Sequence, residues 1–190
     1  TEIYNFSLHD SLQIYTGRLK QLLGEELQVD SRNIHAFIIG EHGDSELAVW
    51  SEANVSGLAL EDFCRIRGQA LSRVDMDRLY RQVRDSAYEI IRRKGVTCYG
   101  IAMGVGRIAA SIIRDEHAVL PISVVLDGQY GLDGLALSIP SIVGRGGLED
   151  ILEIPLSGEE ESALRNSARQ MHEVISTLKL SREPAYSKIF

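Results

Sequence analysis

The spacing of apolar residues predicts three amphipathic helices. Apolar positions recur every three or four residues over 11–23, and we expect this short helix to end at Gly24. The same spacing is most regular over 75–94, which predicts a longer helix. A last helix follows Ser157, because Ser157 and Glu160 have the spacing of a capping box.

Short apolar runs rich in β-branched residues predict strands between these helices. The predicted strands are 33–39, 46–50, 118–126 and 135–140. A turn rich in glycine and aspartate joins the last two, which we expect to be neighbours, and 142–150 is predicted to be a loop. Strands and helices do not alternate regularly, so the sequence predicts an α+β fold in which long helices pack against a small, mainly antiparallel sheet.

The segment GVGRIA at 104–109 has the glycine spacing of a dinucleotide-binding loop. In that interpretation a helix and an apolar strand follow it, and Asp127 stands where a ribose-binding carboxylate would be. However, Ile101, Val105, Ile108 and Ile112 are spaced as on one helix that runs through the glycines. The alternative is therefore a continuous helix whose small residues allow close packing.

Composition narrows the class of protein. The chain has 190 residues, 44% of them hydrophobic, and a formal net charge of −7. This is typical of a soluble globular domain and argues against a nucleic-acid partner. The two cysteines, Cys64 and Cys98, form no paired motif, which favours a reducing cytosol. No apolar run has the length of a membrane span and no signal-peptide pattern occurs, so we expect a cytoplasmic protein without a membrane partner.

The polar segment EHGDS at 41–45, between two predicted strands, is the strongest candidate for chemistry. His42, Asp44 and Ser45 are too close in sequence for the usual geometry of a hydrolytic triad. A zinc site needs more ligands than one histidine and a carboxylate, so we expect no metal. General acid–base chemistry by His42 remains.

Several segments resemble the L-lactate dehydrogenase family. They are IIGEHGDSE followed by VWS, KGVTCYGIAMGVGRIAASII, SVVLDGQYG and LSIPSIVG. The resemblance covers about residues 16–180 and corresponds to the second, substrate-binding domain of that family. It implies that GVGRIA lies inside a helix. We therefore expect an atypical leader at 1–15, a lactate/malate dehydrogenase-like C-terminal domain at 16–190, and no N-terminal Rossmann domain for NAD.

The resemblance also implies roles for individual residues. His42 matches the proton donor and acceptor, and Arg18 matches the arginine that binds the substrate carboxylate. Thr97 matches a threonine beside the substrate, and Ile101 matches an apolar residue near the nicotinamide ring. The implied cofactor is NAD, bound mainly by the absent domain.

One position departs from the family pattern. Family members have an aspartate three residues before the substrate-binding arginine, where it orients the histidine and stabilises its protonated form. This chain has Tyr15 at that position. Losing such an acid lowered the rate of a serine protease by about four orders of magnitude.

Two positions resemble an effector site. In bacterial members activated by fructose 1,6-bisphosphate, a basic residue and a histidine bind its phosphates, and the matching residues are Lys20 and His35. Lysine keeps the positive charge but not the bidentate geometry of arginine. The resemblance also implies assembly into homo-oligomers.

These features lead us to expect the substrate-binding and catalytic domain of an NAD-dependent L-lactate dehydrogenase, which interconverts pyruvate and lactate and is inactive as an isolated chain. Three alternatives stay open. The chain could belong to a malate dehydrogenase or another L-2-hydroxy-acid dehydrogenase. It could be a non-catalytic oligomerisation fragment, or it could bind nucleotides alone through GVGRIA and Asp127.

Overall fold

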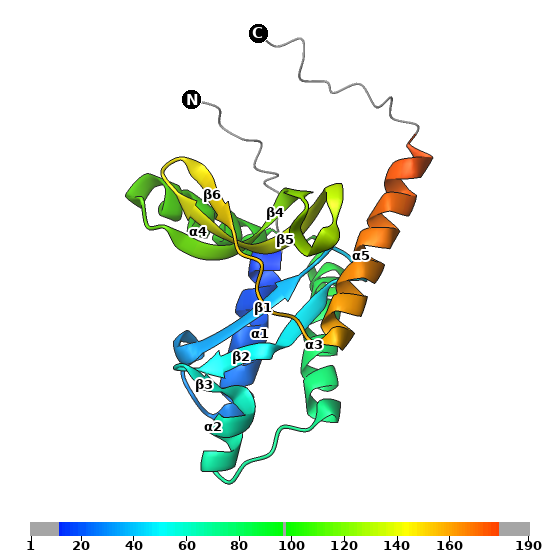
Figure 1. The fold of residues 1–190 in the computed structure, drawn as a ribbon. Coiled ribbons are helices and arrows are strands. Elements are labelled where there is room, and N and C mark those ends of the chain that lie inside the picture. Colours follow the sequence, from blue (N-terminus) through cyan, green and yellow to red (C-terminus); the bar gives the residue numbers. More distant parts are fainter. Residues whose placement is uncertain (1–11, 97, 179–190) are drawn as a thin grey trace.

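The first half of the chain builds a three-stranded antiparallel sheet with helices packed against it. The computed structural model describes residues 12–96 and 98–178 (Figure 1). The strands in this half are β1 (Ile34–Ile39), β2 (Leu47–Val55) and β3 (Leu58–Ala59), in the order β1-β2-β3. The helices are α1 (Leu12–Leu27), α2 (Leu60–Ile66) and α3 (Arg73–Lys94). A short 3-10 turn (Ser31–Asn33) leads into β1.

The second half builds another three-stranded antiparallel sheet. Its strands are β4 (Ala118–Asp127), β5 (Asp133–Gly144) and β6 (Gly147–Ile151), in that order, with a 3-10 turn (Gln129–Gly131) between β4 and β5. Its helices are α4 (Tyr99–Arg114) and α5 (Gly158–Thr177). In Figure 1 the β1-β2-β3 sheet lies below the β4-β5-β6 sheet, and α5 runs alongside both. The α+β class is thus confirmed, with two small sheets.

A glycine joins the two sheets. Gly40 and Ser138 form an isolated antiparallel bridge through two backbone hydrogen bonds of 2.9 and 2.8 Å. Gly40 has a φ of +102°, and a β-carbon there would lie 2.9 Å from Ser167 Oγ. The backbone conformation and the close approach of α5 both require glycine. Because His42 follows two residues later, this junction fixes the start of its turn.

The structure contradicts two predictions about individual segments. The first helix continues past Gly24 to Leu27. Gly24 is buried, and a β-carbon there would lie 2.8 Å from the Val29 carbonyl oxygen, so the glycine allows a close approach and does not end the helix. The segment 142–150 is not a loop, because Val143 pairs with Leu148 in a β5–β6 hairpin.

The segment GVGRIA lies inside α4, which confirms the continuous-helix interpretation. A β-carbon on Gly100 or Gly104 would lie 3.3 Å from the side chain of Ile14 on α1. These glycines therefore let α4 approach α1 closely. Within residues 12–96 and 98–178, no helix combines the length and apolar character needed to cross a membrane.

The predicted division at residue 15 falls within α1, which begins at Leu12. It stays a prediction, because residues 1–11 lie outside the described part of the chain.

Candidate active site

His42 lies in the tight turn between β1 and β2, where its side chain is exposed. The turn is held to α5 at its start, because the backbone N–H of Glu41 donates to Ser167 Oγ at 2.7 Å. The hydroxyl of the buried Ser45 donates to Glu41 Oε2 at 2.6 Å and closes the turn. The imidazole of His42 is thus presented on a short, anchored segment.

Helix α1 brings Tyr15 to His42. The two ring centroids are 5.4 Å apart and the ring planes meet at 68°, an edge-to-face contact. The next residue fixes this geometry, since the buried Thr16 Oγ1 accepts a hydrogen bond of 3.0 Å from the backbone N–H of Ile38 on β1. The histidine therefore contacts an aromatic ring where the family pattern has an acid.

Arg18 follows Tyr15 by three residues, so both lie on one side of α1. It is exposed and lines an open groove of about 800 Å³ between α1 and α3. The groove walls carry both charges and some apolar surface, from residues that include Leu22, Glu25, Arg78, Glu89 and Arg93. His42 is not among the lining residues. The structure therefore links the predicted carboxylate-binding and proton-transfer residues through α1 and Tyr15.

The other predicted site residues are spread over three elements. Ile101 lies on α4 with 38% of its surface exposed. Lys20 is partly buried on α1, and burial lowers the pKa of its ammonium group. His35 is exposed on β1, against which α1 packs. Thr97 lies outside the described residues.

Sequence reasoning missed Glu46, which is only 4% exposed. Both of its carboxyl oxygens are buried, with no hydrogen-bond partner among the residues that the structure describes. Burial, followed by the charge of Glu41, raises the pKa of Glu46 to about 8. Burial and then the charge of Glu46 raise the pKa of Tyr15 to about 12. The only sequence signal was an acid at the start of an apolar β-type run.

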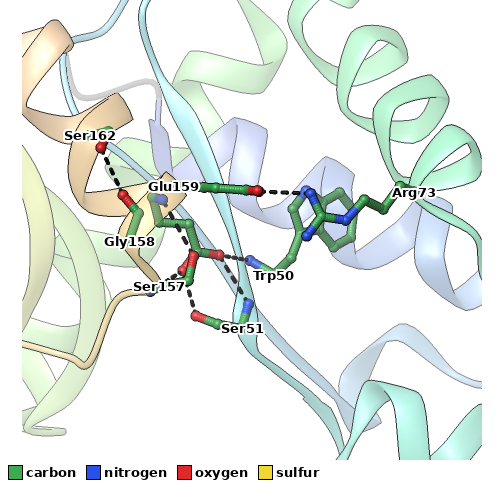
Figure 2. A network of polar contacts seen from close by, with 8 residues as sticks. Trp50, Ser51, Arg73, Ser157, Gly158, Glu159 and Ser162 are labelled. Carbon is green, nitrogen blue, oxygen red and sulfur yellow. Dashed lines mark hydrogen bonds and ion pairs between the residues drawn. The ribbon is translucent and has the colours of Figure 1, made fainter.

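Glu160 is a second buried acid, but its oxygens are well paired. Its partners Trp50, Ser51 and Ser157 are labelled in the polar network of Figure 2. The Glu160 oxygens accept from the backbone N–H groups of Trp50 at 2.8 Å, Ser51 at 3.0 Å and Ser157 at 2.8 Å. The Ser51 hydroxyl also donates at 2.5 Å. Burial pushes the pKa of Glu160 upward, but the hydrogen bonds outweigh it and lower the pKa. This network ties the start of α5 to β2 and confirms the predicted capping box.

Comparison with known proteins identifies the family. Residues 14–180 match the family described as lactate/malate dehydrogenase, alpha/beta C-terminal domain. The chain belongs to this family. An L-lactate dehydrogenase of Acetivibrio thermocellus is 45% identical over 86% of this chain and 51% of its own length. An L-lactate dehydrogenase of Moorella thermoacetica is 48% identical over 87% of this chain and 52% of its own length.

Solved structures of lactate dehydrogenases share the fold. The enzyme MGS-M5, from a Medee basin deep-sea metagenome library, has a TM-score of 0.84 and 38% identity, over 88% of this chain and 54% of its own. The minor L-lactate dehydrogenase of Enterococcus mundtii, in its ligands-bound form, has a TM-score of 0.83 and 35% identity. The match covers 89% of this chain and 54% of the Enterococcus mundtii chain. This chain thus spans about half the length of the relatives it matches.

Proposed function

We propose that this chain is the substrate-binding and catalytic domain of an NAD-dependent L-lactate dehydrogenase. The observation that carries the proposal is the contact of Tyr15 with His42, which joins the histidine turn to the helix that bears Arg18. The similarity to L-lactate dehydrogenases over most of this chain supports the choice of substrate. Pyruvate and lactate are therefore the proposed substrate and product.

The chemistry assigned to this chain is binding and proton transfer. The planar guanidinium of Arg18 pairs with both oxygens of a substrate carboxylate and orients a 2-oxo or 2-hydroxy acid. The imidazole of His42 gives a proton to the substrate oxygen during reduction and takes it back during oxidation. An exposed turn suits this role, because the imidazole exchanges protons with solvent between turnovers.

The described residues fit only a small part of NAD. Ile101 offers exposed apolar surface on α4, which suits contact with a nicotinamide ring. The glycines of GVGRIA lie within α4 and pack towards α1, so they form no loop for a pyrophosphate at a helix start. Hydride transfer therefore depends on groups outside the described residues.

The regulatory part of the proposal concerns Lys20 and His35. Their elements pack together, and one residue is cationic while the other becomes so on protonation. Two such groups on neighbouring elements suit the phosphates of fructose 1,6-bisphosphate.

A homo-oligomerisation role is the second candidate, because large apolar side chains remain exposed along two helices. They are Ile90 and Ile91 near the end of α3, and Tyr99, Met103 and Ile113 on α4. Such a surface is typical of protein interfaces. We expect light scattering over a concentration series to show self-association, and a monomer throughout would exclude this candidate.

Two assays of the isolated chain test the proposal. With pyruvate and NADH we expect no decrease in NADH absorbance, and in a fluorescence titration we expect no saturable NADH binding. Saturable binding would contradict the assignment of NAD to groups outside this chain. Oxaloacetate and branched 2-oxo acids are tested as alternative substrates. Turnover with one of these acids, and none with pyruvate, would show that pyruvate is not the substrate.

A further inference from the structure

The end of α4 and the β5–β6 hairpin meet at a cluster of three titratable side chains, Asp115, His117 and Glu149. Asp115 follows the last residue of α4, His117 directly precedes β4, and Glu149 lies on β6. One nitrogen or oxygen atom from each side chain lies within 4.8 Å of the other two. The cluster is separate from the candidate active site, so the proposed proton transfer gives it no role.

A single imidazole contacts both carboxylates of this cluster. His117 Nδ1 lies 2.6 Å from Glu149 Oε2, and His117 Nε2 lies 3.6 Å from Asp115 Oδ1. Because an ionised carboxylate can only accept, Nδ1 carries the proton of the shorter contact. Only the imidazolium form has a proton on each nitrogen, and therefore only this form directs a donor towards both carboxylates. A neutral ring directs a lone pair towards one of them.

The cluster has residue types that bind zinc, but its arrangement favours a proton. The two carboxylates face different nitrogens of the ring, so a metal ion bound to either nitrogen would have only one of these carboxylates beside it. Zinc sites in proteins use three or four side chains around the ion. The arrangement therefore suits an imidazolium between two carboxylates better than a metal ion.

The same two carboxylates shape the turn at 145–146 between β5 and β6. The backbone N–H of Arg145 donates to Asp115 Oδ1 at 2.8 Å. The Glu149 carboxylate lies over Gly144 so closely that a β-carbon on this glycine would collide with it. His117 thus contacts both acids that hold the turn in place.

The link between α4 and β4 needs contacts to hold it. Asp115 and His117 have φ values of +56° and +48°, a left-handed conformation that costs energy for residues other than glycine. A separate contact joins the hairpin to α4 (Figure 1), since the buried Ser111 hydroxyl donates to the Val143 carbonyl at 2.7 Å. Neither of these two groups titrates near neutral pH. Loss of charge on His117 therefore loosens the turn without detaching the hairpin.

We propose that His117 is a protonation-dependent clasp, which fixes the β5–β6 turn to the end of α4 and loosens it when the imidazole loses its proton. The charged groups that face this region come from α4, the α4–β4 link and the hairpin. They are Arg107, Arg114, Asp115, Glu116, Arg145 and Glu149. Arg107 and Arg114 pair with Glu116, which leaves Asp115 and Glu149 to face the imidazole.

The direction of the pH dependence follows from these contacts. The hydrogen bond with Glu149, followed by the charges of Glu149 and Asp115, raises the pKa of His117 above 6.5. A group whose pKa is higher in the folded chain contributes its full stability below the unfolded pKa and loses it as the pH rises through the folded value. The clasp therefore opens on the alkaline side of pH 6.5.

The test is an NMR titration of the full chain from pH 5 to pH 9. It follows the imidazole signals of His117 together with the backbone amides of Arg145 and Gly146. We expect a His117 midpoint above 6.5, and amide shifts that change with the same midpoint. Above this midpoint the order parameters of the two amides should fall, because the turn gains motion on the picosecond to nanosecond timescale.

Two variants separate the clasp from a general effect of charge. Glu149→Gln keeps the shape of the side chain but removes its charge, so it should lower the His117 midpoint and weaken the response of the turn amides. Asp150→Asn removes an exposed acid at the next position of β6 and should leave the midpoint in place. His172 on α5 should titrate identically in both variants and in wild type.

The wild-type titration decides the proposal even when a variant does not fold. A His117 midpoint at or below 6.5 would overturn the clasp, and so would turn amides that keep their order while His117 loses its proton. An equal fall of the midpoint in Glu149→Gln and Asp150→Asn would also contradict it, because the effect would then belong to net charge.

Discussion

Tyr15 occupies the position where an acid would hold His42 in its protonated form. A substitution can restore the acid at this position. We expect Tyr15→Asp to place a carboxylate beside the imidazole and to raise the pKa of His42 by about 1–3 units, because a neighbouring opposite charge favours the ionised form. The measurement is the NMR titration of His42. Tyr15→Asn is the matched neutral control, and an equal shift in both variants would contradict an electrostatic cause.

Glu46 makes stability depend on pH in a definite direction. The pKa of Glu46 is raised from 4.5 to about 8, so between these values the folded chain binds more protons than the unfolded chain. Stability contributed by this group therefore falls as the pH rises through this window. Relative to wild type, we expect Glu46→Gln to be more stable at pH 9 than at pH 5 by about 1–3 kcal/mol.

Urea unfolding at the two pH values measures this difference. Glu52→Gln provides the control, because Glu52 lies on β2, which begins directly after Glu46, and its side chain is exposed. A free-energy difference between Glu46→Gln and wild type that is the same at both pH values would show that Glu46 is already ionised at low pH.

At the scale of the elements, α5 depends on one side chain. Glu160→Ala removes the acceptor for three backbone N–H groups and the Ser51 hydroxyl, and leaves buried donors unpaired. We expect a loss of about 1–3 kcal/mol in the free energy of unfolding, measured with urea. Glu161→Ala, at an exposed position on the same turn, should lower the free energy of unfolding much less. Equal losses would contradict the role of the network.

The two glycines of GVGRIA should respond oppositely to substitution. Nothing lies within 4 Å of a β-carbon on Gly106, so Gly106→Ala should stabilise α4 by up to about 1 kcal/mol. Gly104→Val should lower the free energy of unfolding by about 1–3 kcal/mol, because the new side chain would press on Ile14. Urea unfolding of both variants decides this, and loss of stability in Gly106→Ala would contradict the helix interpretation.

The element types were predictable from the sequence wherever periodicity and caps agree. The Ser157–Glu160 capping box and the apolar stripe of α3 gave correct helices. The hairpin at 142–150 was hidden because its glycines are typical of a loop, whereas Val143 and Leu148 pair within the sheet. Gly24 was taken as the end of the first helix, but it is needed because the chain turns back after the helix and brings the Val29 carbonyl close to it.

At the scale of the whole molecule, the sequence did not indicate how its parts meet. The bridge between Gly40 and Ser138 joins two sheets far apart in the sequence, and one sheet was expected. The motif around His42 indicated the residue that we propose for proton transfer, through a family resemblance. Glu46 could not be found this way, because the burial of its carboxyl depends on α1 and α3, which pack beside the turn.

The central claim is that this chain binds a 2-oxo acid and moves its proton. The most direct measurement joins residues 12–180 to the other half of the Moorella thermoacetica relative and follows pyruvate-dependent NADH oxidation. We expect slow turnover that Tyr15→Asp raises by about 10²–10⁴-fold. His42→Gln and Arg18→Gln should abolish it, whereas Arg169→Gln, an exposed control on α5, should not. No turnover even with Tyr15→Asp, or turnover that survives His42→Gln, would contradict the claim.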